Sequence, residues 1–174
     1  MNPLDRAQPA AALAAQSKDL QLARVVVFFE TLSLESTRQL GTVYSDNAWF
    51  KDPFNEVRGI AAITGLFAHM FEQVDAPRFV ITTKIAQGDD AFITWDFLFR
   101  MKRFSTEEQC IRGATHLKFG PDGRVDFHRD YWDAAEELYE KLPLLGSLMR
   151  FLKRAARKKV PIPLPAAVIR PPPL

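Results

Sequence analysis

Residues 17–140 of the 174-residue chain are predicted to fold as one α+β domain, with a curved antiparallel sheet wrapped around three N-terminal helices. The first part of this region carries apolar residues at steps of three and four, the period of an amphipathic helix. From about residue 79 apolar residues alternate with others, and turn sequences separate the alternating stretches. Because the strands follow one another directly, an antiparallel sheet covered by helices is favoured over a parallel one.

Three helices are expected before residue 77. The first spans about 18–32, and the second is short and follows Ser33, whose hydroxyl can cap it. The third follows Gly59 and is expected to end at Pro77. It has the clearest apolar stripe, formed by Ile60, Ile63, Phe67, Met70, Phe71 and Val74.

The strands are predicted from alternation and from turn chemistry. A short strand at 49–52 stops at Pro53, and longer strands are expected at 79–85, 91–102, 108–119 and 124–132. Gly88–Asp90 and Pro121–Gly123 have the composition of turns. Asp133 is expected to cap a helix that begins at Ala134. Curling such a sheet around the helices gives a cone-shaped domain with an internal pocket.

Charge separates the body of the chain from its tail. Residues 1–140 hold 15 basic and 21 acidic residues, a net charge of −6, so nucleic acid is not an expected partner. Residues 141–174 hold eight basic residues and no acidic one. Cys110 is the only cysteine, which excludes a disulfide within the chain. No secretory signal or membrane-spanning run is recognisable, so a cytoplasmic protein is expected.

Three segments flank the predicted domain. Residues 1–16 are rich in Ala, Pro and Gln and are expected to be flexible. Residues 141–160 are predicted to form a basic amphipathic helix. Within it, residues 143–159 either bind an anionic membrane or acidic partner, or pack their apolar stripe on the domain or on a second subunit. Residues 161–174 contain six prolines and are expected to be extended.

Two stretches resemble the ketosteroid isomerases and SnoaL-like polyketide cyclases of the nuclear-transport-factor-2-like superfamily. The first is the run 44–54 with its Asp52-Pro53 pair, followed by Arg58-Gly59 and Ile63. The second comprises Leu117-Lys-Phe, Asp122-Gly-Arg-Val125 and Tyr131-Trp132. Together they cover most of residues 20–135. The resemblance implies the cone-shaped fold, which hosts isomerases, cyclases, dehydratases, hydrolases and proteins that only bind ligands.

The resemblance also implies positions for a site. The aspartate of the Asp-Pro pair is the proton-moving base of ketosteroid isomerase, and Asp52 matches it. That enzyme builds its oxyanion hole from a tyrosine and a protonated aspartate, whose positions fall here on Phe28 and Arg112. Phe28 has no donor and Arg112 stays charged, so steroid isomerisation by that mechanism is not expected.

Polar residues of the last strand are expected to take the place of that oxyanion hole. The match places His128, Asp130 and Trp132 on the inward face, where alternate residues point to the same side. Arg112, and with it His116, is expected to point inward from the neighbouring strand. An Asp–Arg–Asp arrangement would loosely resemble the water-activating site of limonene-type epoxide hydrolases.

The predicted catalytic set therefore consists of Asp52, Arg112, His128 and Asp130. Asp52 is the expected base, the two residues of the last strand relay the proton, and Arg112 stabilises developing negative charge. The substrate is expected to contact Phe28, Trp49, Phe67, Trp95, Phe97, His116 and Trp132.

These residues also have structural interpretations. Asp52 can simply cap its loop, Arg112 can form an ion pair with an aspartate, and the polar residues of the last strand can face solvent. A bulge at Gly113 would turn His116 to the other face. The His-x-Asp pair of the last strand lacks an evident third ligand, and no metal or other cofactor is expected.

The sequence thus predicts a SnoaL-like pocket protein for a small, largely apolar molecule, assembled as a homodimer through the outer face of its sheet. As an enzyme it would be a cofactor-independent isomerase, cyclase, dehydratase or hydrolase. The alternatives are a non-catalytic ligand-binding module and an interaction protein that uses its basic helix.

Overall fold

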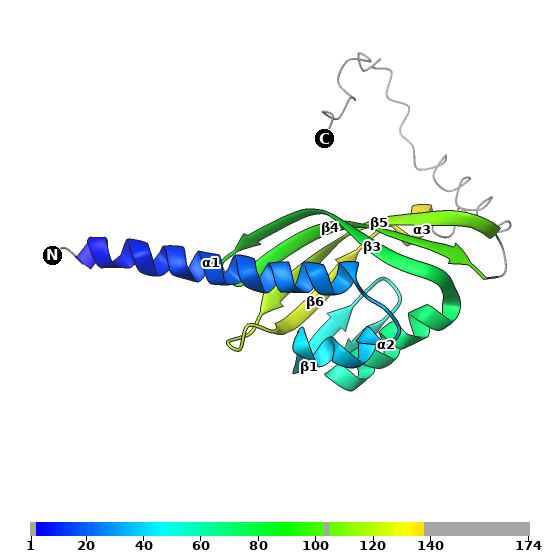
Figure 1. Cartoon of the computed structure of the whole chain (residues 1–174), viewed down its shortest axis with the longest axis horizontal. Helices are drawn as coiled ribbons and strands as arrows, with labels where there is room; N and C mark the ends of the chain where they lie inside the picture. Colours follow the sequence, from blue (N-terminus) through cyan, green and yellow to red (C-terminus); the bar gives the residue numbers. More distant parts are fainter. Residues whose placement is uncertain (1–2, 103–104, 138–174) are drawn as a thin grey trace, which may run out of the picture.

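The computed structural model describes residues 3–102 and 105–137, with the side chains of 16–102 and 107–137 (Figure 1). Its sheet has six strands in the order β2-β1-β6-β5-β4-β3. The strands are β1 (Tyr44–Lys51), β2 (Glu56–Arg58), β3 (Val74–Gln87), β4 (Asp90–Met101), β5 (Ser105–Phe119) and β6 (Val125–Tyr131). The helices are α1 (Pro3–Glu30), the 3₁₀-helix η1 (Ser36–Thr42), α2 (Ile60–Gln73) and α3 (Ala134–Glu137).

The predicted α+β architecture is confirmed, with one change in the sheet. β3, β4, β5 and β6 pair antiparallel, whereas β1 pairs with β6 in parallel, so the sheet is mixed. The parallel pair joins the first strand of the chain to the last one. The start and the end of the domain therefore meet in the middle of the sheet rather than at its edges.

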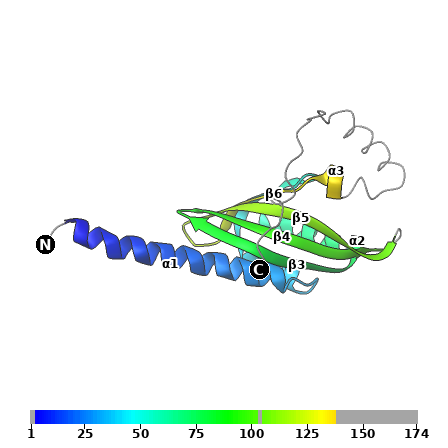
Figure 2. The same cartoon turned by 90° about the horizontal axis from the view of Figure 1, so that it is seen from above.

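Helix α1 is longer than the sequence predicted. It begins at Pro3, whereas residues 1–16 were expected to be flexible. The run 10–15 is rich in alanine, the residue with the highest helix propensity, and proline is tolerated at the first helical position. The N-terminal part of α1 extends beyond the sheet (Figures 1 and 2). Its C-terminal part buries Leu22, Val25 and Phe29, as the periodicity predicts.

Helix α2 confirms the predicted start after Gly59, whose φ of 91° favours glycine. The helix ends at Gln73, and β3 follows at once. Pro77 therefore lies inside β3 rather than at the end of the helix. A strand accepts a proline at a bulge, and the pairing of β3 with β4 shifts beside Ala76, which has a φ of 49°.

The pairing of β4 with β5 fixes which side chains face the interior. Trp95 lies opposite Gly113, and the register runs through this glycine without a shift. Side chains alternate along a strand, so Gly113 lies on the inner face together with Ile111, Thr115 and Leu117, which are buried. A Cβ on Gly113 would lie 2.4 Å from the indole ring of Trp95. The glycine therefore makes room for the tryptophan and does not form a bulge.

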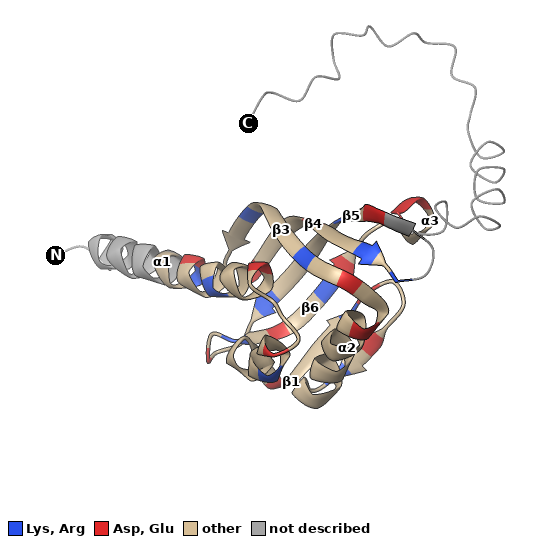
Figure 3. Cartoon of the chain, turned by 45° about the vertical axis from the view of Figure 1, so that its right-hand side comes forward, with Lys and Arg blue, Asp and Glu red and all other residues tan. Residues whose placement is uncertain are grey.

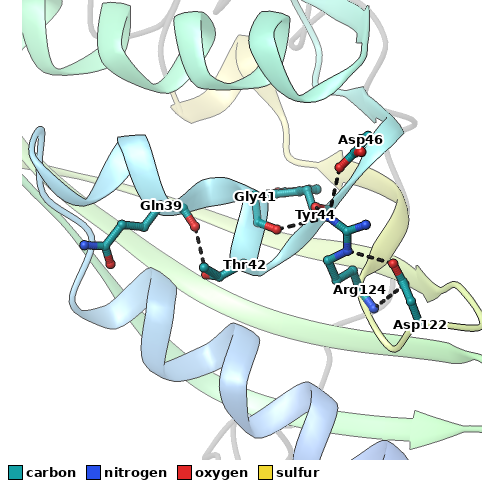
Figure 4. A network of polar contacts seen from close by, with 7 residues as sticks. All are labelled: Gln39, Gly41, Thr42, Tyr44, Asp46, Asp122 and Arg124. Atoms are coloured by element: carbon teal, nitrogen blue, oxygen red, sulfur yellow. Dashed lines mark hydrogen bonds and ion pairs between the residues drawn. The ribbon is translucent and has the colours of Figure 1, made fainter.

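Arg124 ties the β5–β6 turn to the start of β1 (Figure 4). Its Nη1 donates to the carbonyl oxygens of Gly41 and Tyr44 at 3.2 and 3.3 Å and to Asp46 at 2.9 Å. Its Nε donates to Asp122 at 2.7 Å. Hydrogen bonds from the backbone and then the side chain of Arg124 lower the pKa of Asp122. These contacts hold η1 and β1 beside β6.

Tyr44 is the largest fully buried side chain of the domain. Its hydroxyl lies 2.7 Å from Nδ1 of His128. Burial, and after it the negative charge of Asp130, raises the pKa of Tyr44 well above its ordinary value. The phenol therefore stays protonated in the folded protein.

Gly113→Ala is expected to lower the free energy of unfolding by about 1–3 kcal/mol, because the added methyl group forces Trp95 to move in a packed core. Urea unfolding followed by tryptophan fluorescence measures the change. The matched control is Gly65→Ala on the exposed face of α2, where a Cβ meets no atom within 4 Å. That change is expected to stabilise the protein by about 0.5–1 kcal/mol. Unaltered stability of Gly113→Ala would contradict the close packing.

Tyr44 is expected to ionise only as the protein unfolds. A tyrosine in an unfolded chain has a pKa of about 10, and the folded value of Tyr44 is raised. Its contribution to stability is thus fully present below about pH 10 and is lost as the pH rises further. Ultraviolet titration should show a late tyrosine ionisation step that coincides with loss of circular dichroism. The late step should be absent in Tyr44→Phe. Ionisation of Tyr44 without unfolding would refute its burial.

Candidate functional site

The described residues line a cavity of about 940 Å³ that opens to the surface between α2 and the concave face of the sheet. Glu72 is the only Asp, Glu, Lys or Arg of α2, and Figure 3 shows this helix almost free of such residues. The volume is in the range of pockets that hold drug-sized ligands. Its walls are mainly apolar, and their aromatic residues include Phe50, Phe67, Phe79, Trp95, Phe97 and Trp132.

A second, smaller space of about 20 Å³ shares part of its lining with the large cavity. Phe67, Phe79, Trp95 and Asp130 line both spaces, and His128 lines only the smaller one. The smaller space has room for one water molecule and has polar groups on its wall. Asp130 is therefore the charged residue that faces both spaces.

A chain of hydrogen bonds converges on one oxygen of Asp130. Trp95 Nε1 donates to Thr115 Oγ1 at 2.7 Å, and Thr115 Oγ1 donates to Asp130 Oδ1 at 2.5 Å. An indole nitrogen can only donate, so the hydroxyl of Thr115 has its own proton left for Asp130. From the other side, Nε2 of His128 lies 2.9 Å from the same Oδ1.

The imidazole of His128 is held by partners on every side. Its ring stacks on Phe50 with 4.6 Å between centroids, and only 3% of the residue is exposed. Tyr44 stays protonated and can donate to Nδ1, which leaves the Nε2 hydrogen for Asp130. In this arrangement the histidine is a donor that orients the carboxylate.

The two oxygens of Asp130 consequently differ. Oδ1 accepts hydrogen bonds from Thr115 and His128, which stabilise negative charge on the carboxylate. No described residue donates a hydrogen bond to Oδ2. The side chain is 16% exposed and borders the large cavity. Chemically, Oδ2 can accept a proton or a hydrogen bond from a bound molecule.

Asp52 also borders the large cavity, but the loop uses its carboxylate. Oδ1 accepts the backbone N–H groups of Phe54 and Asn55 at 2.7 and 2.6 Å. The side-chain amide of Asn55 donates to both oxygens, at 3.1 and 3.0 Å. These contacts match the loop-capping interpretation of Asp52.

The expectation that Arg112 points inward is wrong. Its side chain is 71% exposed, with Nε 4.0 Å from Asp96 and Nη1 4.0 Å from Glu137. The cause is the unbroken register through Gly113, which places Arg112 on the outer face. An Asp–Arg–Asp arrangement is therefore not formed inside the cavity by this arginine.

His116 lies four positions after Arg112 on the same strand, so its side chain also points outward. This corrects its predicted place in the substrate site. Nε2 of His116 lies 2.5 Å from Asp90, and the ring stacks on Phe92 with 4.4 Å between centroids. Hydrogen bonds from His116 and then Lys118 lower the pKa of Asp90. These contacts belong to the outer surface of the sheet.

Four of the other residues predicted to contact the substrate line the large cavity: Phe67, Trp95, Phe97 and Trp132. The remaining two do not. Phe28 is half-buried and packs edge-on against Phe29. Trp49 stacks on Phe127 with 4.8 Å between centroids, on the outer face of the sheet. Its place on β1 is one residue from buried Phe50, so the two side chains point to opposite sides.

Sequence reasoning missed Thr115 and Tyr44. Thr115 is the only hydroxyl on a strand face otherwise formed by Ile111, Gly113, Leu117 and Phe119, and an isolated polar residue on an apolar face is a usable signal. Tyr44 carried no comparable signal, because its partner is 84 positions away in the chain.

Two further expectations concern metals and membranes. Among residues 3–102 and 105–137, no three His, Cys, Asp or Glu side chains form a group able to hold a metal ion. No helix in that part of the chain is long and apolar enough to span a bilayer. The predicted basic helix and its segment 143–159 lie outside the described residues.

Solved structures with the same fold share little sequence with the chain. A SnoaL-like polyketide cyclase from Shewanella putrefaciens has a TM-score of 0.60 and 17% identity, with 73% of this chain and 96% of that chain covered. A similar protein from Jannaschia has a TM-score of 0.60, 14% identity and coverages of 70% and 88%. An LEH-like epoxide hydrolase from M. tuberculosis has a TM-score of 0.58, 18% identity and coverages of 76% and 96%. Comparison with curated proteins gives no match.

The sequence profile of the SnoaL-like domain matches residues 25–128, more than half of the chain. This stretch runs from the buried end of α1 to His128 and includes all strands up to the middle of β6. The curved six-stranded sheet agrees with that match. The protein therefore belongs to the SnoaL-like domain family.

Proposed function

We propose that this protein binds a small, largely apolar molecule in the large cavity and exchanges a proton with it through Asp130, without a cofactor. The observation that supports the proposal is the asymmetry of the Asp130 carboxylate. Oδ1 is held by Thr115 and His128, while Oδ2 borders an aromatic-walled cavity. A carboxylate fixed at one oxygen and open at the other has the geometry of a general base.

The simplest reaction of this class is an isomerisation. Oδ2 takes a proton from a carbon of the substrate, and the electron pair of the broken C–H bond stays on the substrate. The same proton then returns to another atom of that molecule, so the carboxylate is regenerated. Cyclisation, dehydration and hydrolysis use the same proton exchange at one of their steps. In each case Thr115 and His128 position the carboxylate.

This proposal moves the base from Asp52 to Asp130. Protonation of Asp52 would weaken the hydrogen bonds that it accepts from Phe54 and Asn55 and so disturb its loop. Protonation of Asp130 at Oδ2 leaves both bonds to Oδ1 in place. Proton uptake at Oδ2 of Asp130 is therefore compatible with the contacts that position this side chain, which is not the case for Asp52.

The second candidate is a carrier that binds the same kind of molecule without changing it. The large volume and the aromatic walls of the cavity favour binding in either case. The two candidates differ in whether Oδ2 of Asp130 takes up a proton from a bound molecule.

A base-catalysed elimination of 5-nitrobenzisoxazole separates the two candidates without knowledge of the natural substrate. In this reaction a base removes the C3 proton, the N–O bond breaks, and a coloured cyanophenolate forms. A carboxylate in an apolar cavity is a stronger base toward it than one in water. We expect wild-type protein to accelerate the reaction and Asp130→Asn to lose at least about 100-fold of the rate, in the range typical of a lost general base.

Asp52→Asn tests the rival assignment in the same assay. It is expected to keep most of the activity, because its carboxylate is bonded to the loop. Asp96→Asn, on the outer face beside Arg112, is the matched control for loss of a carboxylate outside the cavity. Loss of activity in Asp52→Asn with retention in Asp130→Asn would return the base to Asp52. No acceleration by wild-type protein would favour the carrier.

We also propose a homodimer formed through the outer face of the sheet. Large apolar side chains are exposed on this face and include Val80, Ile85, Phe92 and Tyr131. Phe92→Glu, at a residue that is 47% exposed, is expected to weaken the dimer at least about tenfold, because it places a charge in an apolar interface. Sedimentation equilibrium measures the effect. A monomeric wild-type protein would exclude this assembly.

A further inference from the structure

The charged groups around the large cavity are not equivalent. Lys102 Nζ donates to the carbonyl oxygen of Glu72 at 2.6 Å, so its charge is held at the C-terminal end of α2. His69 and Glu72 lie 3.3 Å apart on largely exposed side chains. Asp52 is bonded to its own loop. Among the described residues that line the cavity, Asp130 alone presents a mostly buried carboxylate with an oxygen that has no donor.

The walls beside this carboxylate are aromatic. Trp95 and Phe79 meet edge to face with 5.7 Å between centroids, and Phe79 stacks on Phe97 at 4.6 Å. Trp132 packs edge-on against Phe54 with 5.3 Å between centroids. The faces of such rings are electron-rich and attract cations, above all weakly hydrated ammonium groups.

The carboxylate of Asp130 and the aromatic rings therefore both favour a positively charged ligand. A cation next to Asp130 regains in the cavity the charge interaction that it loses with water, whereas an anion would meet a negative carboxylate at short range. A neutral ligand would contact the aromatic walls but would leave Asp130 without an ion pair to any described Lys or Arg.

We infer that the molecule bound in the cavity is an apolar amine or quaternary ammonium compound whose positive group lies against Asp130 and the rings of Trp95 and Trp132. The inference rests on the proposed function and names the substrate class of that site. A positive charge next to the reacting C–H bond also stabilises the carbanion left after proton removal. The substrate would thus supply the stabilisation that the sequence assigned to Arg112, whose side chain points away from the cavity.

Two probes of equal shape test the inference. Benzyltrimethylammonium carries a positive charge, and neopentylbenzene is the same skeleton with carbon in place of nitrogen. Binding to the full chain is followed by tryptophan fluorescence, because Trp95 and Trp132 line the cavity. The dissociation constant is expected to be at least tenfold lower for the cation, although the hydrocarbon is the more hydrophobic of the two.

Two variants assign the preference to its cause. Asp130→Asn is expected to weaken binding of the cation at least tenfold and to leave the hydrocarbon unchanged. Asp96→Asn removes a carboxylate from the outer face and is expected to change neither probe. The comparison of the two probes on wild-type protein does not require any variant to fold.

The outcomes separate this inference from the proposed function. Equal affinities, or a preference for the hydrocarbon, would overturn the cationic substrate class. If 5-nitrobenzisoxazole is still converted through Asp130 in that case, the proposed base survives alone. A cation preference that persists in Asp130→Asn would also overturn the inference, because it would place the charge elsewhere.

Discussion

The convergence of hydrogen bonds on Oδ1 of Asp130 is the constraint on which the rest of the interior depends. Trp95 lies on β4, Thr115 on β5, His128 and Asp130 on β6, and Tyr44 on β1. The network therefore forms only when four strands have the correct register. Each of these groups is buried or nearly so, and a buried polar group without its partner costs about 1–3 kcal/mol. The same bonds that orient the carboxylate thus select one register of the sheet.

Two features outside the network keep this register. Gly113 lacks the side chain that would collide with Trp95, so the indole can lie across β5 and reach Thr115. Arg124 joins the turn before β6 to the start of β1 and so sets the parallel pair that brings Tyr44 to His128. A shift of one residue in either strand would turn the polar groups to the outer face.

Local sequence patterns predicted much of the fold, because apolar periodicity and helix capping depend only on residues close together in the chain. The stripe of α2 and the cap at Asp133 are each visible within a few residues, and the structure contains both. The alternation of His128 with Asp130 placed these residues on one face, but the resemblance and not the alternation implied that this face points inward. The outward direction of Arg112 was not predictable in this way. It depends on whether Gly113 forms a bulge. No bulge forms, because the ring of Trp95 on the neighbouring strand packs directly over Gly113 in the regular register.

Asp52 and Asp130 show why a matching motif does not by itself identify a base. Both aspartates border the same cavity. The donors of Asp52 belong to the next residues of its own loop, so its oxygens stabilise the local backbone. The donors of Asp130 come from side chains that distant parts of the chain hold in place, and they occupy one oxygen only. One carboxylate oxygen is available to a bound molecule when the hydrogen bonds that position the side chain all go to the other oxygen. Asp130 meets this condition, and Asp52 does not.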